Sequence, residues 1–256
     1  MAAQKERLDV AVVRRGLAPS RERARALIMA GQVYVGERQV DKPGTMIPLA
    51  ADCHLAVIPD ELKYVSRGGL KLEKALDTFH LDPGGLVALD VGASTGGFTD
   101  VLLRRGARKV YAVDVGHGQL AWTLRNDPRV VVMEHTNIRH LTSLPEPIEC
   151  VVIDISFISL RLALPALPPL LIQDVHEGKP WIVALVKPQF EAGKAEVDRG
   201  EGVISDPAVH TRVLQELKEW IPQHTPFQVR GLTDSPIHGR DGNREFLLYL
   251  TMKADM

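Results

Sequence analysis

A glycine-rich turn between an apolar run and a helix start constrains the fold of this chain more than any other feature. The segment reads LVALDVGASTGGFTD over residues 86–100, with an apolar run that ends in Asp90 and a helix pattern that opens at Phe98. The turn between them contains Gly92, Gly96 and Gly97. Such a strand, turn and helix start is where an open α/β sheet binds its ligand, and glycines let the backbone approach that ligand at positive φ. The alternative is an ordinary strand–turn–helix whose glycines serve the turn alone.

The spacing of these glycines argues against a phosphate-containing ligand. It matches neither the dinucleotide-binding pattern G-x-G-x-x-G nor the phosphate-binding pattern G-x-x-x-x-G-K-[ST]. A second strand is predicted over Lys109–Val115, with Asp114 near its end. An acid at that position can hydrogen-bond a ribose diol. We therefore predict an adenosine-containing cofactor without phosphates, S-adenosylmethionine (SAM).

Strands and helices alternate through the larger part of the chain. Strand patterns follow a helical pattern at 69–79, and they lie at residues 86–91, 110–115, 130–133, 151–155 and 181–186. This alternation predicts an α/β fold with a parallel, doubly wound sheet. Two late apolar runs, 227–232 and 246–250, are joined through the turn-rich segment 239–243 and predict a terminal hairpin.

The first sixty or so residues read as a separate small α+β module. Two helical patterns, Arg7–Arg15 and Ser20–Ala30, precede β-like runs at 33–35 and 54–57. Ser20 is a candidate N-cap, and Gly31 is placed to end the second helix. We predict a small domain over residues 1–58, a linker over 59–65 and a large domain over 66–256.

Composition places the chain among soluble cytoplasmic proteins. The formal net charge is −1, so any nucleic-acid binding must come from a local patch. Cys53 and Cys150 lie far apart, which favours a reduced protein without a disulfide framework. The N-terminus has no apolar signal region, and the longest charge-free stretch, 162–173, is too short to span a bilayer.

The N-terminal module carries the local positive charge. Residues 1–25 hold seven basic and three acidic residues. The basic residues are Lys5, Arg7, Arg14, Arg15, Arg21, Arg23 and Arg25, and the acidic ones are Glu6, Asp9 and Glu22. Arg21 and Arg25 share one helix face, where their planar guanidinium groups could bind a phosphate backbone. The alternative is a solvated helix face.

Several motifs resemble known families. RLDVAVVRRGLAPSRERARALIMAGQVYVG, at residues 7–36, resembles the small RNA-binding domain named after ribosomal protein S4. The larger part resembles FtsJ-like SAM-dependent ribose methyltransferases. The combination resembles the TlyA family of ribosomal-RNA 2′-O-methyltransferases, historically also called hemolysins. Its motifs here are YVSRGGLKL at 64–72, DVGASTGGFTD at 90–100, DISFISL at 154–160, KPQFEAGK at 187–194 and GNREFLLYL at 242–250.

The resemblance implies a catalytic tetrad of Lys71, Asp154, Lys187 and Glu245. A ribose hydroxyl is a poor nucleophile, so an enzyme must orient it in line with the sulfonium methyl and help remove its proton. A lysine held near carboxylates can stabilise the developing alkoxide. Asp154 and Lys187 each end a predicted buried strand, so both should lie at the ligand-binding edge of the sheet. Read singly, each residue could instead be a solvated or capping side chain.

The resemblance also implies the binding residues. It places the methionyl part of SAM along Asp90, Gly92 and the turn residues Ser94, Thr95, Gly96 and Gly97, and the ribose at Asp114. Asn137 occupies the position where related enzymes often carry Asp near the adenine. The predicted RNA-binding residues are Arg7, Arg14, Arg15, Arg21, Arg25 and Arg67. The spacing of His117, His135 and His238 matches no metal motif, so we predict no metal site.

These patterns predict a cytoplasmic two-domain enzyme that methylates a ribose 2′-hydroxyl of ribosomal RNA, free or in a ribosomal subunit. The resemblance points to cytidine, but no residue specifies the nucleotide. One alternative is a membrane-active hemolysin, against which the absence of a spanning segment or an amphipathic surface helix counts. Another is a non-catalytic RNA-binding protein with a vestigial methyltransferase fold.

Overall fold

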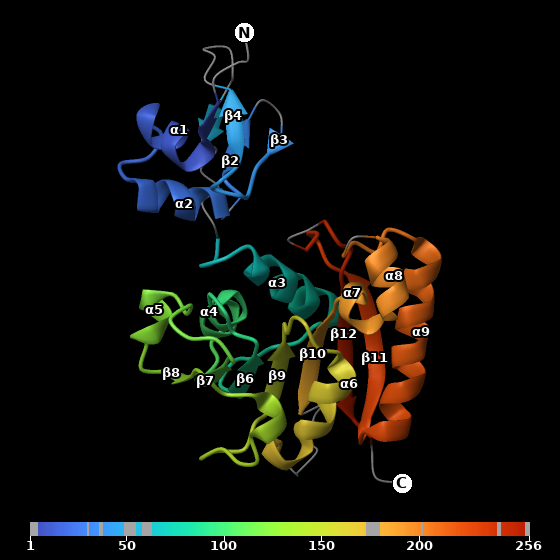
Figure 1. Ribbon diagram of the computed structural model, residues 1–256. Coiled ribbons are helices and arrows are strands. Elements are labelled where there is room, and N and C mark those ends of the chain that lie inside the picture. Colours follow the sequence, from blue (N-terminus) through green and yellow to red (C-terminus); the bar gives the residue numbers. More distant parts are fainter. Residues whose placement is uncertain are drawn as a thin grey trace. The chain divides into compact units, whose positions relative to one another are not determined.

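The chain folds into two compact units, Met1–Ser66 and Arg67–Met256, in a computed structural model (Figure 1). The structure describes residues 5–29, 31–35, 38–48, 55–57, 63–172, 180–200, 202–239 and 242–253. Cys53 and residues 59–62 of the predicted linker lie outside these ranges. Cys150 is fully buried in a strand, as the apolar run around it predicts.

The smaller unit packs two helices and short strands around one core. Its elements are β1 (Lys5–Arg7), α1 (Leu8–Arg14), α2 (Arg21–Met29), β2 (Val33–Val35), β3 (Arg38–Gln39), β4 (Met46–Pro48) and β5 (Leu55–Val57). Each helix buries residues at i, i+3 and i+4, for example Leu8, Ala11 and Val12 in α1. The predicted ends of α2 are confirmed: Ser20 Oγ accepts from the Arg23 N–H at 3.2 Å, and Gly31 has φ +73°.

Short strand pairs complete the smaller unit. β1 pairs with β4, and β3, β2 and β5 form a three-stranded antiparallel sheet in that order. The runs at 33–35 and 54–57 were predicted as strands, whereas β1 and β4 were not. Their pairing joins segments about forty residues apart, and a three-residue strand has too few side chains to show a period of two.

A seven-stranded sheet forms the larger unit, in the order β11-β12-β10-β9-β6-β7-β8. Its strands are β6 (Val87–Val91), β7 (Lys109–Val113), β8 (Val130–Met133), β9 (Cys150–Ile153), β10 (Trp181–Val186), β11 (Phe227–Asp234) and β12 (Phe246–Met252). The five strands from β6 to β10 are parallel, and β11 and β12 form an antiparallel hairpin. The predicted α/β class and terminal hairpin are confirmed. β7 ends at Val113, so Asp114 lies just beyond the strand rather than inside it.

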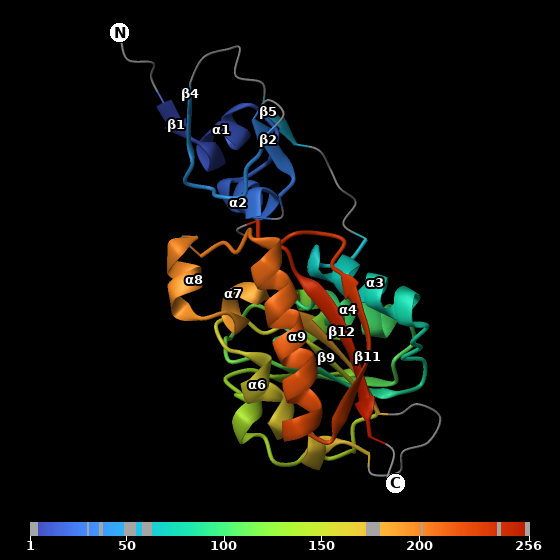
Figure 2. The ribbon, with the colours of Figure 1, turned by 90° about the vertical axis from the view of Figure 1, so that its right-hand side faces the viewer.

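Helices cover both faces of this sheet (Figure 2). The helices are α3 (Gly68–Phe79), α4 (Gly97–Arg104), α5 (Trp122–Arg125), α6 (Leu160–Ala163), α7 (Pro188–Glu191), α8 (Lys194–Arg199) and α9 (Pro207–His224), with 3₁₀ turns η1 (Ile138–His140), η2 (Leu164–Ala166) and η3 (Pro168–Leu170). Helices α3 and α4 lie over one face, and α6 and α9 lie over the other.

Strand alternation decides which face each site residue takes. The core on the α6–α9 face contains Leu89 of β6, Ile153 of β9, Val186 of β10 and Phe246 of β12. Because successive side chains point to opposite faces, the residue directly after Leu89, Ile153 and Val186, and the residue directly before Phe246, turn toward α3 and α4. The predicted site residues Asp90, Asp154, Lys187 and Glu245 are those neighbours.

Candidate active site

Three predicted catalytic residues lie at one edge of the sheet. Asp154 directly follows β9, and Lys187 directly follows its parallel neighbour β10. Glu245 directly precedes β12, which runs antiparallel to β10 with Phe246 beside Val186. Continued by one residue, that register places Glu245 beside Lys187. The three residues therefore meet at the carboxyl edge of the parallel strands, where open α/β sheets bind ligands.

Two ion pairs complete this arrangement. Lys71 of α3 places its Nζ 2.5 Å from Glu245 Oε2, and Lys187 Nζ lies 2.6 Å from Asp154 Oδ1. Lys187 also donates to Ser156 Oγ at 2.8 Å. The four charged side chains are between 3% and 22% exposed. Burying four charges costs desolvation energy that pairing only partly offsets, so this cluster is typical of a functional site rather than of a stabilising device.

Asp90 is a fully buried carboxyl near the end of β6. Thr99 of α4 donates to Asp90 Oδ2 at 2.6 Å, while Oδ1 is buried without a hydrogen-bond partner among the described residues. Burial raises the pKa of Asp90 to about 7; the bond from Thr99 opposes this rise, and the charge of Asp154 adds to it. An ionised carboxylate here would favour a cationic ligand group.

Asp90 is expected to destabilise the folded, ligand-free protein at alkaline pH. Its ordinary pKa is 3.8 and its folded pKa is about 7, so the folded state takes up a proton that the unfolded state has released. The free energy of unfolding should therefore fall as pH rises between these values. Asp90→Asn, which keeps an acceptor for Thr99, should raise it by up to about 4 kcal/mol at pH 8. Urea denaturation would measure this gain, which should grow between pH 5 and 7 and then level off. A gain independent of pH would contradict the assignment.

Two turn glycines are required by contacts within the protein. Gly92 has φ +86°, and a Cβ there would collide with the carbonyl oxygen of Asp154. Gly96 has φ +97°, and a Cβ there would collide with the Leu124 side chain of α5. These glycines were predicted to adopt positive φ and to let a ligand approach the backbone, and the positive φ is confirmed at both. The backbone of Asp154 excludes any side chain at Gly92, and the positive φ favours glycine at Gly96, whereas Gly97 is a buried residue that begins α4.

Asp114 organises the loop that follows β7. Its Oδ2 accepts from the Ser94 N–H at 2.8 Å, and its Oδ1 accepts from the Gly116 N–H at 2.7 Å. Ser94 has φ +48° and donates from Oγ to Gln119 Oε1 at 3.1 Å. These residues line a cavity of about 10 Å³, which is room for about one water molecule. A ribose is larger than a water molecule, so this cavity would have to widen to admit one beside Asp114.

Asn137 and Thr95 take part in local backbone contacts. Asn137 Oδ1 accepts from the Arg139 N–H at 3.1 Å and caps the turn η1. Asn137 is not among the residues that line the cavity at Asp114. Thr95 is exposed, and its carbonyl accepts from the Ala121 N–H at 3.1 Å.

Two acids anchor the arginines of the smaller unit. Arg7 Nε lies 3.0 Å from Asp9 Oδ1, Arg21 Nε lies 2.9 Å from Asp9 Oδ2, and Arg14 pairs with Glu6. Asp9 is completely buried, and its hydrogen bond from Arg7 holds the pKa of that carboxyl below its ordinary value. Arg7 and Arg21 remain 47% and 57% exposed. A guanidinium has five N–H donors, so both can still bind phosphate while anchored.

The remaining predicted RNA-binding residues, Arg15, Arg25 and Arg67, differ in exposure and position. Arg25 is exposed on α2, and Arg15 is half-buried just after α1. Arg67 is half-buried and directly precedes α3 in the larger unit.

Across the described residues, no group of three or more His, Cys, Asp or Glu side chains could hold a metal ion. The rings of His117 and His135 stack on each other, with centroids 4.8 Å apart. In the same part of the chain, no helix combines the length and apolar character that crossing a membrane requires.

Comparison with known families identifies the larger unit. Residues 64–252 match the family model of the FtsJ-like methyltransferases. The chain belongs to this family. Residues 6–50 match the S4 domain, so this methyltransferase carries a domain of that type at its N-terminus. Both resemblances found in the sequence are confirmed, and the fold and enzyme class predicted from them are confirmed as well.

Similar proteins match along nearly the whole chain. YqxC of Bacillus subtilis, which carries the name of an rRNA methyltransferase, is 50% identical over 98% of this chain and 87% of its own. The 16S/23S rRNA (cytidine-2′-O)-methyltransferase TlyA of Mycobacterium tuberculosis is 46% identical over 99% of this chain and 92% of its own. A solved structure from Streptococcus thermophilus, named as a hemolysin, is 44% identical with a TM-score of 0.74, covering 99% of this chain and 90% of that one.

Three residues of this methyltransferase were not singled out from the sequence. Ser156 contacts Lys187, and Gln119 contacts Ser94 beside Asp114. Phe157 is 87% exposed and has φ +68°, although it lies only three residues after Asp154. Ser156 and Phe157 belong to the motif DISFISL, so their place beside Asp154 was the available signal.

Proposed function

We propose that this protein transfers the methyl group of SAM to the 2′-hydroxyl of a cytidine ribose in ribosomal RNA. The observation that carries the proposal is two neighbouring ion pairs, the buried Lys71–Glu245 and the half-buried Lys187–Asp154, at the ligand-binding edge of a methyltransferase sheet. Taking these charged side chains out of water costs free energy that pairing only partly returns, which favours a functional role for them. The names of the TlyA and YqxC relatives support rRNA as the substrate class.

The residues at the turn after β6 fit SAM. The buried Oδ1 of Asp90 could accept from the ammonium of the methionyl part. Asp114, half-exposed and bonded through each oxygen to one backbone N–H, keeps lone pairs for the ribose hydroxyls. Bound SAM supplies an electrophilic methyl group on a sulfonium centre.

Lys187 is placed to act on the ribose oxygen. An ammonium has three N–H donors, and among the described residues Lys187 contacts Asp154 and Ser156. The third N–H could donate to the 2′-oxygen, orient it and stabilise the negative charge that grows there during transfer. The hydroxyl proton leaves to a carboxylate of the tetrad or to solvent. Glu245, paired with Lys71, lies on the other side of Lys187 from Asp154. We therefore propose that the tetrad positions the oxygen and stabilises its charge.

The smaller unit would supply phosphate contacts rather than chemistry. Replacing both Arg21 and Arg25 by alanine should weaken RNA binding and flatten its salt dependence by up to about two phosphate contacts, with SAM affinity unchanged. A salt titration of ribosomal-subunit binding would measure this change. Arg212→Ala is the matched control, because Arg212 is an exposed, ion-paired arginine on α9. If the double variant binds like the parent at every salt concentration, these arginines do not contact RNA and merely form a solvent-exposed helix face.

Transfer to isolated substrates tests the proposal. The protein is incubated with methyl-labelled SAM and, separately, with each purified ribosomal subunit and with protein-free RNA from each. We expect label in at least one substrate, at a site that blocks primer extension as a 2′-O-methyl group does. No transfer to any of them by a protein that binds SAM would overturn it. Because ribosomes lie in the cytoplasm, we also propose that the protein acts there. Lysis of cells by the purified protein would instead favour the function suggested by the hemolysin name.

A further inference from the structure

The loop that begins at Asp154 and the segment that begins at Lys187 contact each other at three places along their length. At the first, Lys187 contacts Asp154 at 2.6 Å and Ser156 at 2.8 Å. At the second, the rings of Phe157 and Phe190 lie with centroids 5.3 Å apart. At the third, Glu191, the last residue of α7, contacts Ser159 and Leu160 at the start of α6.

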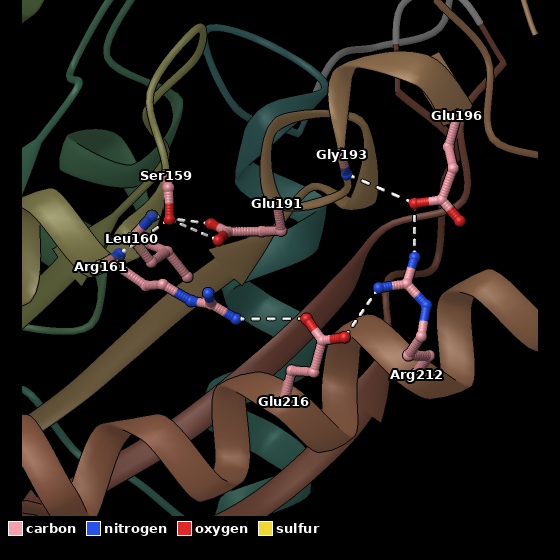
Figure 3. Close-up of polar contacts among 8 residues, drawn as sticks. All are labelled: Ser159, Leu160, Arg161, Glu191, Gly193, Glu196, Arg212 and Glu216. Atoms are coloured by element: carbon pink, nitrogen blue, oxygen red, sulfur yellow. Dashed lines mark hydrogen bonds and ion pairs between the residues drawn. The ribbon is translucent and has the colours of Figure 1, made fainter. Parts of the chain in front are cut away.

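Glu191 uses both of its carboxylate oxygens in this contact (Figure 3). Ser159 Oγ donates to Glu191 Oε2 at 2.5 Å, and the Leu160 N–H donates to Oε1 at 2.7 Å. Ser159 in turn accepts from the Arg161 N–H at 3.1 Å and caps α6. Burial raises the pKa of the Glu191 carboxyl, and the hydrogen bonds from Ser159 and Leu160 oppose that rise. The two accepted bonds tie Glu191 to the N-terminus of α6, and losing either would leave a polar group without its partner.

The loop fixed by these contacts contains a strained residue. Phe157 has φ +68°, a left-handed conformation that non-glycine residues rarely adopt, and its side chain is 87% exposed. Such conformations persist where the flanking contacts determine the backbone on both sides. Lys187 holds the side that begins at Asp154, and Glu191 holds the side that ends at Ser159.

We propose that Glu191 is a positioning residue for methyl transfer, which fixes the loop 154–160 against the segment that follows Lys187 and so sets the geometry of the Asp154–Lys187 pair. This inference rests on the proposed function. Glu191 itself need touch neither SAM nor RNA. Small displacements of a catalytic group reduce the rate of the chemical step far more than they weaken binding.

Glu216 provides a matched control within the same network. It accepts from Arg212 at 2.7 Å and from Arg161 at 3.4 Å, and Figure 3 shows it on α9, outside the contact between the two loops. Its side chain is 42% exposed, and exposed ion pairs of this kind contribute little. Glu216→Gln therefore makes the same acid-to-amide change and disturbs Arg161 without touching Ser159 or Leu160.

Steady-state methylation kinetics with Glu191→Gln, Ser159→Ala, the double variant and Glu216→Gln test the proposal. We expect Glu191→Gln to lower kcat about 10- to 100-fold, with KM for RNA and SAM affinity within about threefold of the parent. Ser159→Ala should lower kcat less, and the double variant should be no slower than Glu191→Gln, because both changes break the same contact. Glu216→Gln should match the parent.

The outcomes separate this inference from the proposed function. A parent protein that transfers no methyl group would refute the function itself. If the parent is active and folded Glu191→Gln keeps the parental kcat, or changes only KM for RNA, the positioning role is wrong. Should Glu191→Gln fail to fold, Ser159→Ala decides alone, since it removes one hydroxyl and a parental kcat in that variant would overturn the proposal.

Discussion

Lys187→Ala is expected to reduce the turnover of methyl transfer by about 10²–10⁴-fold while SAM and RNA affinities stay within a few-fold of the parent. The ammonium of Lys187 lies 2.6 Å from Asp154 and 2.8 Å from Ser156, and we propose that its third N–H, without a partner among the described residues, donates to the ribose oxygen. That bond strengthens as negative charge develops, so its loss appears in kcat rather than in binding. Single-turnover kinetics with saturating SAM would measure the effect.

The same substitution also has a structural consequence that must be measured separately. Asp154 Oδ1 is buried and forms an ion pair with Lys187, so Lys187→Ala should cost about 1–3 kcal/mol of stability. A thermal melt establishes that the variant is folded at the assay temperature. Lys187→Arg keeps the charge but should not restore turnover, because a guanidinium is larger and planar and does not place an N–H donor where the compact ammonium does. Parental turnover in a folded Lys187→Ala protein would remove this residue from the mechanism.

Asp114→Ala should weaken SAM binding by about ten- to a hundredfold, which corresponds to about 1.5–3 kcal/mol, and leave RNA binding largely intact. The variant loses acceptors for the ribose diol, and it also releases the backbone N–H groups of Ser94 and Gly116. Calorimetry on the protein alone measures the SAM affinity.

Asp114→Asn separates these two contributions. Its amide keeps one acceptor oxygen for the loop but lacks the charge and the second acceptor that the diol would use. We expect it to bind SAM more tightly than Asp114→Ala and less tightly than the parent. Unchanged SAM affinity in both folded variants would show that Asp114 is only a loop anchor.

The sheet and its active edge could be predicted because both depend on local patterns. The apolar run 181–186 is the strand β10 within its predicted bounds, and parallel strands bring their carboxyl ends to one edge. Asp154 and Lys187 directly follow such runs, so their proximity follows from the alternation of strands and helices. The ion pair between them confirms that expectation.

Contacts between distant segments could not be predicted in this way. Lys71 and Glu245 are 174 residues apart, and only the resemblance to a family joined them before the structure did. Asp9 looked like one acid in a basic segment, but it is buried and anchors Arg7 and Arg21. Gly92 was predicted to have positive φ and does, but the close backbone of Asp154, which leaves no room for a Cβ there, has no signal in the sequence. In each case the pattern gives the residue type and the fold decides its partner.

Nucleoside mass spectrometry tests the central claim most directly. Ribosomal RNA treated with the protein and with SAM carrying a deuterated methyl group is digested to nucleosides, and the labelled methyl is located on base or sugar by fragmentation. We predict label on the ribose of cytidine, absent when Lys187→Ala replaces the parent protein. Label on a base would contradict 2′-O-methylation by this site. So would RNA that stays unlabelled after treatment with a folded protein that binds SAM.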